Sequence, residues 1–173
     1  AEELRGRANE EWVALAEGLF RNGSAAWGVA ALPDLAQVVT GLALAPYLRR
    51  AAAGVRAHLD TSARHRGYCP VCGGHPDWAF LGESAGERHL VCSRCDTPWP
   101  FPRLQCPFCG CDDQDQLGYY PSEDGAYRLY VCEHCRHYLK TRDLRHPQPQ
   151  RPVTAERILT ISMDIAAQEQ GYR

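Results

Sequence analysis

Eight of the nine cysteines in this 173-residue chain form four Cys-x-x-Cys pairs, a pattern typical of metal binding. Two residues between the ligands allow a tight turn to bring both sulfurs to one ion, and four thiolates make the closed tetrahedral site of a structural metal. The 19 residues 73–91 and the 22 residues 110–131 separate the pairs, close to the spacing of four-cysteine zinc ribbons. We predict two such sites, whose ligands are Cys69, Cys72, Cys92, Cys95, Cys106, Cys109, Cys132 and Cys135.

An internal repeat indicates which pairs share an ion. The segment Cys69–Gly73 is echoed by Cys106–Gly110, and Val91–Cys95 is echoed by Val131–Cys135. Proline after the first cysteine presets φ, and glycine after the second tolerates the positive φ that such a turn requires. The repeat predicts that the first and second pairs hold one ion and the third and fourth hold another. Interleaved pairing or one empty site is the alternative.

Cysteine pairs can also serve functions other than metal binding. A single Cys-x-x-Cys can be a redox dithiol, but thioredoxin-type motifs occur once at a strand-to-helix junction, whereas this chain has four in a repeat. Metal ions that only staple two small ribbons would explain the cysteines without any catalysis. The ninth thiol, Cys111, precedes Asp112 and Asp113 and is expected to be a non-ligand in a polar loop; a redox role or service as an alternative ligand is the other possibility. Spacing does not distinguish zinc from iron, which occupies the same Cys-Pro-x-Cys-Gly turn in rubredoxins.

The sequence predicts a protein that is not an enzyme. It has no phosphate-binding loop, no nucleophile elbow and no His-Glu-x-x-His motif, and its only lysine is Lys140. Eight cysteines saturate two tetrahedra, so no position is left open for water or substrate. Histidines near the cysteines are therefore expected to be neighbours of the ligands or surface residues: His75, His89, His134 and His137.

Charge argues against nucleic acid as the partner. The whole chain has a formal net charge of −2, but residues 69–140 contain six basic and ten acidic groups. Two divalent ions with four thiolates each bring this segment to about −8, which repels phosphate. The arginines between residues 49 and 66 are expected to form a solvated helix face.

The sequence predicts no membrane insertion and a cytoplasmic location. No apolar run approaches the ~20 residues of a membrane span, and no leader pattern opens the chain. The thiols are therefore expected to stay reduced.

Helices are expected on both sides of the cysteine-rich segment. Apolar residues recur at helical spacing between Leu4 and Phe20, and again after Asp34, a possible N-cap. Pro46 should end or kink this second run, and a further helix should continue to residue 59. In the tail, Thr154 is a plausible N-cap of a helix that is apolar on more than one face and should pack into the body of the protein.

The sequence predicts an α+β fold with two tandem rubredoxin-like or zinc-ribbon metal sites. Turn signals at Ser84-Ala85-Gly86 and Asp124-Gly125 lie between apolar runs and predict one small antiparallel hairpin in each ribbon. The expected parts are a helical N-terminal region, a first ribbon, a second ribbon, and a linker with a C-terminal helix: residues 1–68, 69–104, 105–144 and 145–173.

The cysteine-rich segment closely resembles the formate dehydrogenase accessory protein family of FdhE type. Generic zinc ribbons do not share the residues between the cysteine pairs, and here the resemblance covers residues 69–173. Its motifs are Cys69–Gly73, Arg88–Trp99, Arg103–Gly110, Tyr119-Tyr120, Val131–Cys135, Tyr138–Thr141, Asp143-Leu144 and the terminal Asp164–Arg173.

The resemblance implies a non-catalytic cytoplasmic assembly factor, a chaperone for protein maturation. Such a factor binds the catalytic subunit of formate dehydrogenase before export, and its rubredoxin-like sites carry zinc or iron. Family members have a longer helical N-terminal region than the 68 residues before Cys69, so contacts made by that region are expected to be altered. The sequence leaves self-association open. A nucleic-acid-binding or general protein-interaction zinc ribbon is the alternative function.

Overall fold

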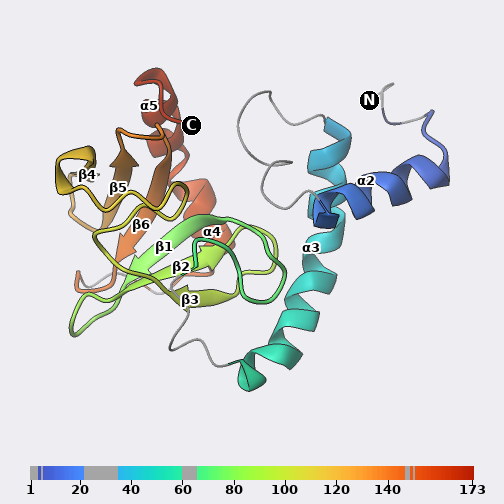
Figure 1. Cartoon of the computed structure of the whole chain (residues 1–173), viewed down its shortest axis with the longest axis horizontal. Coiled ribbons are helices and arrows are strands. Elements are labelled where there is room, and N and C mark those ends of the chain that lie inside the picture. The colour runs from blue at the N-terminus through green and yellow to red at the C-terminus, as the bar shows by residue number, and fades with distance from the viewer. Residues whose placement is uncertain (1–3, 5, 22–34, 60–65, 147–148, 150) are drawn as a thin grey trace.

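Six strands from the two predicted ribbons join in one sheet (Figure 1). The computed structural model describes residues 4, 6–21, 35–59, 66–146, 149 and 151–173. The strands lie in the order β3-β2-β1-β6-β5-β4. Their bounds are β1 Pro76–Leu81, β2 Arg88–Cys92, β3 Pro98–Pro100, β4 Leu117–Pro121, β5 Tyr127–Cys132 and β6 Tyr138–Asp143. Helices flank this sheet, so the predicted α+β class is confirmed.

The internal repeat of the sequence is a repeat of the sheet. Each ribbon is a three-stranded antiparallel meander, β1-β2-β3 or β4-β5-β6, and the turns of both hairpins contain a glycine at positive φ, Gly86 (65°) and Gly125 (69°). The ribbons are joined by parallel pairing of β1 with β6, in which Trp78 lies opposite Lys140. Beyond the strands, the Leu144 N–H donates to the Leu81 carbonyl (3.1 Å). The first strand of one unit therefore accepts the third strand of the other.

Proline occupies the outward positions of the edge strand β3. The Phe101 N–H donates to the Arg88 carbonyl (3.0 Å), which places the odd-numbered residues of this segment against β2. The alternate residues are Pro98, Pro100 and Pro102, none of which has an N–H to offer to another strand. This edge cannot be extended by ordinary strand pairing.

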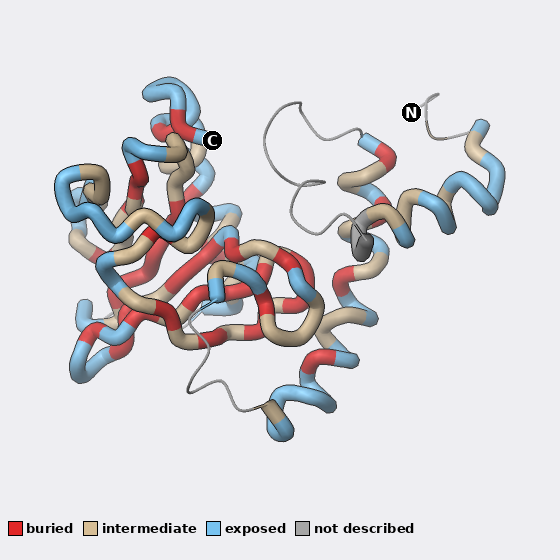
Figure 2. The backbone as a smooth tube through the Cα atoms, viewed as in Figure 1, coloured by how far each residue is buried: buried red, intermediate tan, exposed pale blue. Residues whose placement is uncertain are grey.

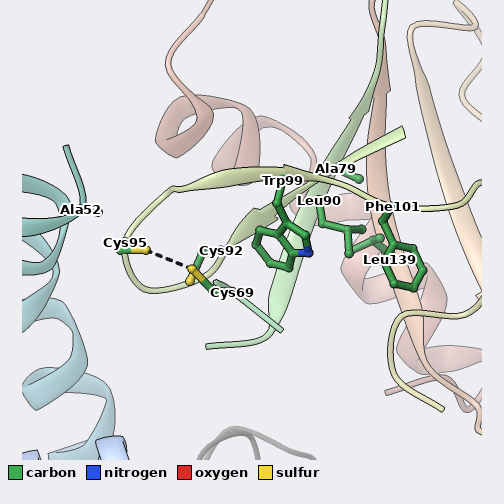
Figure 3. Packing of buried hydrophobic residues seen from close by; sticks show 9 residues of the cluster. All are labelled: Ala52, Cys69, Ala79, Leu90, Cys92, Cys95, Trp99, Phe101 and Leu139. Carbon is green, nitrogen blue, oxygen red and sulfur yellow. Dashed lines mark hydrogen bonds between the residues drawn. The ribbon is translucent and has the colours of Figure 1, made fainter. Parts of the chain in front are cut away.

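The hydrophobic core lies on one face of the sheet and extends to the first group of cysteines (Figure 3). Trp99 is 2% exposed, and its indole Nε1–H donates to the Arg66 carbonyl (2.8 Å). A second cluster, which includes Leu129 and Val131, packs with Ala167 of the C-terminal segment. Since adjacent strand residues point to opposite faces, Tyr130 joins the first cluster while its neighbours join the second.

Two N-terminal helices lie outside the sheet. Helix α2 (Asn9–Arg21) packs across α3 (Leu35–Val55), which is followed by the short helix η2 (Arg56–His58) (Figure 1). Pro46 was predicted to end or kink the helical run. It does not end the helix, because α3 continues through it. Ala36 and Ala52 are both buried, on either side of Pro46, and such packing offsets the roughly 3 kcal/mol that an internal proline costs. The expected cap Asp34 lies outside the described residues.

The C-terminal segment forms two helices rather than one. Helix α4 (Val153–Leu159) begins after Pro152, one residue before the predicted cap, and α5 (Ile161–Glu169) begins after Thr160. Both are tied to the sheet by ion pairs: Arg142 with buried Glu156, and Lys140 with Asp164 (2.5 Å). The expectation that the apolar faces pack into the body was wrong for four side chains, each more than half exposed. These are Ile158, Leu159, Ile161 and Ile165.

Candidate metal centres

The four Cys-x-x-Cys pairs form turns of one design. In the first, the Cys69 N–H donates to the Gly74 carbonyl (2.7 Å), and the Gly73 N–H donates back to the Cys69 carbonyl (3.0 Å). The third pair repeats this pattern, because the Cys106 N–H donates to the Cys111 carbonyl (2.8 Å). The glycines that follow these two pairs have φ of 71° and 78°, the left-handed conformation expected from the motif.

The second and fourth turns place a residue other than glycine in the left-handed region. Asp96 (φ 53°) and Arg136 (φ 58°) each follow the last cysteine of a ribbon. Their N–H groups donate to the carbonyls of Cys92 (3.2 Å) and Cys132 (2.8 Å). Such a conformation costs about 1–2 kcal/mol for an L-residue with a Cβ, so the contacts of these two side chains gain importance.

The turns gather the eight predicted cysteines into two groups of four. Site 1 contains Cys69, Cys72, Cys92 and Cys95, and site 2 contains Cys106, Cys109, Cys132 and Cys135. In site 1, the Sγ atoms of Cys72 and Cys92 are 3.4 Å apart, and those of Cys69 and Cys95 are 3.5 Å apart. In site 2, two separations are 3.7 Å. These are the same groups that the sequence repeat favours.

The sulfur separations fit one ion in each group. A disulfide needs sulfurs about 2.05 Å apart, and all nine cysteines are free thiols. A tetrahedral ion with bonds of about 2.3 Å holds its sulfurs about 3.8 Å apart. Site 2 has nearly this separation and site 1 is slightly tighter. Each group can therefore hold one metal ion.

Backbone N–H groups and a hydroxyl point at the sulfurs. The Val71 N–H lies 3.4 Å from the sulfur of Cys69, and the Thr97 hydroxyl lies 3.1 Å from that of Cys95. Hydrogen bonding from the Cys72 thiol lowers the pKa of Cys69 to about 7. At Cys109, burial raises the pKa, but hydrogen bonds led by the Cys111 N–H bring it down to about 7. The backbone N–H and hydroxyl donors favour the thiolates that metal binding requires, whereas the hydrogen bond between the two thiols raises the pKa of its donor, Cys72.

The two sites differ in burial. Site 1 has three buried cysteines and the half-buried Cys72. Site 2 has an exposed cysteine, Cys109, and the half-buried Cys135. Residues 92–96 at site 1 are buried or half-buried, whereas most of residues 109–115, which precede β4, are exposed (Figure 2). Site 1 also joins the hydrophobic core and contacts Ala52 of α3 (Figure 3).

Asp96 connects site 1 to helices at both ends of the chain. Its carboxylate pairs with Arg49 of α3 (2.5 Å) and with Arg157 of α4 (2.7 Å). The Arg157 guanidinium also donates to Asp77 (2.8 Å) and to the Cys92 carbonyl (3.1 Å). Neither Asp96 nor Arg157 was predicted as a functional residue. Their 61-residue separation gave no local signal, although a non-glycine in this turn position could have marked Asp96.

Arg136 has the corresponding role at site 2. Its guanidinium lies 4.1 Å from the ring centroid of Tyr172 and donates to the Gln170 carbonyl (2.6 Å). Its own carbonyl accepts from the Arg173 N–H (2.8 Å). The last residues of the chain are thus fastened to the fourth cysteine turn.

The histidines near the sites lie among aromatic rings. Phe108, inside the third cysteine turn, stacks on His137 (ring centroids 4.6 Å apart) and tilts against His75 (6.2 Å). Burial lowers the pKa of both imidazoles and so favours their neutral forms. His89 stacks on Phe80 at 4.9 Å. Within the described ranges, neither cysteine group includes a histidine or Cys111.

A contact between the ribbons fixes the sites relative to each other. A Cβ added to Gly67, just before site 1, would lie 1.8 Å from the Pro107 carbonyl oxygen, so only glycine allows this approach. Beside this contact, Phe108 bridges the two ribbons through its ring contacts with His75 and His137.

Across the parts of the chain that the structure describes, no helix has the length and apolar character of a membrane span.

Comparison with known proteins agrees with this architecture. The profile of the "FdhE, central domain" matches residues 68–103. An FdhE homologue from Aquifex aeolicus is 38% identical over 111 residues, covering 62% of this chain and 39% of that protein. The crystal structure of FdhE from Pseudomonas aeruginosa superposes with a TM-score of 0.69 at 26% identity, covering 99% of this chain and 59% of that one. The chain is therefore similar to FdhE proteins in both sequence and fold.

FdhE relatives also match the N-terminal helices. The homologue from Haemophilus influenzae strain PittEE is 29% identical over 184 residues, which cover 99% of this chain and 61% of that protein. The chain therefore spans between about two fifths and three fifths of the FdhE proteins compared with it. The family resemblance seen in the cysteine motifs is confirmed.

Proposed function

We propose that this protein is a non-catalytic accessory factor that binds the catalytic subunit of formate dehydrogenase and supports its maturation. The FdhE family relationship carries the proposal. The acidic character of residues 69–140, with ten acidic and six basic groups, favours a protein partner over nucleic acid. We place this action in the cytoplasm, before export, where thiols stay reduced.

The eight cysteines of sites 1 and 2 are proposed to bind two ions, zinc or iron. Four thiolates around each ion leave no open position for substrate, so the ions act as staples that hold the cysteine turns in place. Through Asp96 and Arg136, the same turns hold α3, α4 and the C-terminal residues. The metal thus determines the surface that a client would meet.

The test is capture of the client by the metal-loaded chain. Affinity-tagged protein is expressed in its own host, and the captured material is probed for the formate dehydrogenase catalytic subunit in reducing and oxidising buffers. We expect capture by the unaltered chain and by Cys111→Ser, and loss of capture in Cys92→Ser. Metal analysis of the same samples should give about two ions per chain, and about one in Cys92→Ser. Failure to capture the subunit, together with salt-sensitive binding to DNA or RNA, would contradict the proposal.

A further inference from the structure

The outer edge of β4 is the open end of the sheet (Figure 1). The Ser122 N–H donates to the Tyr127 carbonyl (2.9 Å), and the Glu133 N–H donates to the Gln116 carbonyl (2.8 Å). The even-numbered positions of this strand therefore bond to β5. The backbone groups of Leu117, Tyr119 and Pro121 face outward.

The repeat shows what such an edge can bind. In the first ribbon, Ala79 and Leu81 hold the positions of Tyr119 and Pro121, because they lie opposite the corresponding residues of the middle strand. That edge of β1 is occupied by β6, which runs parallel to it. The edge of β4 has the same orientation within its ribbon, so it is suited to a parallel strand.

The open edge is rich in hydrogen-bond acceptors. The Leu117 N–H is already used, since it donates to the Gln114 carbonyl at the end of helix η3 (Gln114–Gln116). Pro121 has no N–H. Tyr119 therefore supplies the outward donor of β4, against outward carbonyls at all three positions. A segment that pairs here must supply N–H groups at alternate positions.

This requirement argues against a second copy of the chain as the occupant. Continuing the sheet in the pattern of the repeat would place β3 of another copy against β4. The outward residues of β3 are Pro98 and Pro100, followed by Pro102, and none can donate. Pairing would leave carbonyls of β4 without donors, a cost that strand pairing does not repay.

Charge indicates the chemistry of the segment that fits. Exposed carboxylates lie at both ends of β4: Asp112, Asp113 and Asp115 before it, and Glu123 and Asp124 after it. Arg128, whose guanidinium lies 4.7 Å from the ring centroid of Tyr119, is paired with Asp143 (2.8 Å). Tyr119 and Tyr120 are 50% and 58% exposed and offer ring faces on opposite sides of the strand.

We propose that the outer edge of β4 is a strand-addition site for an extended, basic segment of a partner protein. The segment pairs in parallel with Leu117–Pro121, its N–H groups donate to the outward carbonyls, and its lysines or arginines meet the flanking carboxylates and tyrosine rings. The inference does not depend on which protein supplies the segment, so it can fail while the proposed function stands.

A synthetic peptide tests the site on the full chain. The probe is an acetylated eight-residue peptide in which lysine alternates with valine and threonine, and the control peptide has glutamate in place of lysine. We expect the lysine peptide to bind with salt sensitivity and to protect the Tyr119 amide from hydrogen exchange. The glutamate peptide should bind at least about tenfold more weakly.

Variants separate strand pairing from ring contact. Tyr119→Pro removes the outward N–H without touching the bonds to β5, and should weaken peptide binding about tenfold. Tyr119→Ala keeps the N–H and should weaken binding less. Metal content and circular dichroism of both variants report whether the fold is kept.

Peptide binding that protects other amides and leaves the Tyr119 amide unprotected would overturn the proposal. Equal binding of the glutamate peptide would overturn it too. Dimerisation of the chain through β4, detected by sedimentation and by protection of the same amide, would also overturn it.

Discussion

Gly74 and Cys111 occupy the same position in two otherwise matching cysteine turns. Each accepts a hydrogen bond from the first cysteine of its ribbon. A Cβ on Gly74 would lie 3.0 Å from the sulfur of Cys92 and 3.1 Å from Cδ of Arg94. The sequence indicated that Cys111 is not a ligand, but it gave no sign that its counterpart has to be small. That need arises from a sulfur 18 positions away in the chain.

Gly74→Ala should destabilise site 1. The added methyl must displace a ligand sulfur or the Arg94 side chain, at a cost of about 1–3 kcal/mol in the free energy of unfolding. Urea titration of the metal-loaded protein measures this loss, and metal analysis should show weaker retention of one ion. Cys111→Ala is the matched control, with an expected change within about 0.5 kcal/mol and two ions kept. The opposite order of the two variants would show that the thiol of Cys111 does bind metal.

Among the elements, helix α4 is held against site 1 by its one arginine. Arg157 is 17% exposed in its side chain and contacts Asp96, Asp77 and the Cys92 carbonyl. Arg157→Gln should lower the free energy of unfolding by about 2–3 kcal/mol, because the mostly buried guanidinium loses its hydrogen bonds to two carboxylates. Amide hydrogen exchange in Val153–Leu159 should speed up while two ions remain bound.

Arg49→Gln is the control for this ion-pair network. Arg49 contacts the same Asp96 from α3, but its side chain is 39% exposed, so its loss should cost at most about 1 kcal/mol. Exchange in α4 should stay as in the unaltered protein. If Arg157→Gln left α4 exchange unchanged, the helix would be held by its contacts with β6 instead.

The elements also show why sequence predicted some parts and not others. The cysteine turns and hairpins have local signals, namely proline, glycine and Asp-Gly at fixed positions, and these are present in the structure. Strand β3 was not predicted, because Pro98 and Pro100 argue against a strand and are tolerated only at an edge. The continuation of α3 through Pro46 depends on burial of Ala36 and Ala52, which a local pattern does not contain.

In the whole molecule, the repeat predicted two units but not how they join. Parallel pairing of β1 with β6 brings together residues about 60 positions apart, and either edge of a meander can accept a strand. What selects the edge is the chemistry of the third strands: prolines block β3, while β6 has Tyr138 and Lys140 at the corresponding positions. The family resemblance predicted the class of fold, and the chemistry of the strand edges explains the order of the six strands in the sheet.

Metal removal should take the molecule apart in two steps. Site 2 contains the exposed ligand Cys109, so a chelator with a thiol reagent should release that ion first, and hydrogen exchange should speed up in β4 and β5. The first ribbon keeps the ion of site 1, the buried Trp99 and the contact with α3. Strands β1 and β2 should therefore stay protected from exchange until the ion of site 1 leaves. Metal release measured alongside exchange mass spectrometry tests this order.

Cys109→Ser and Cys72→Ser are the matched pair of variants. Each should lose one ion, but only Cys72→Ser should expose β1 and β2, because metal binding supplies part of the folding free energy of the ribbon it closes. Release of both ions in a single phase, with all six strands exposed together, would mean that the junction between β1 and β6 couples the two sites into one cooperative unit.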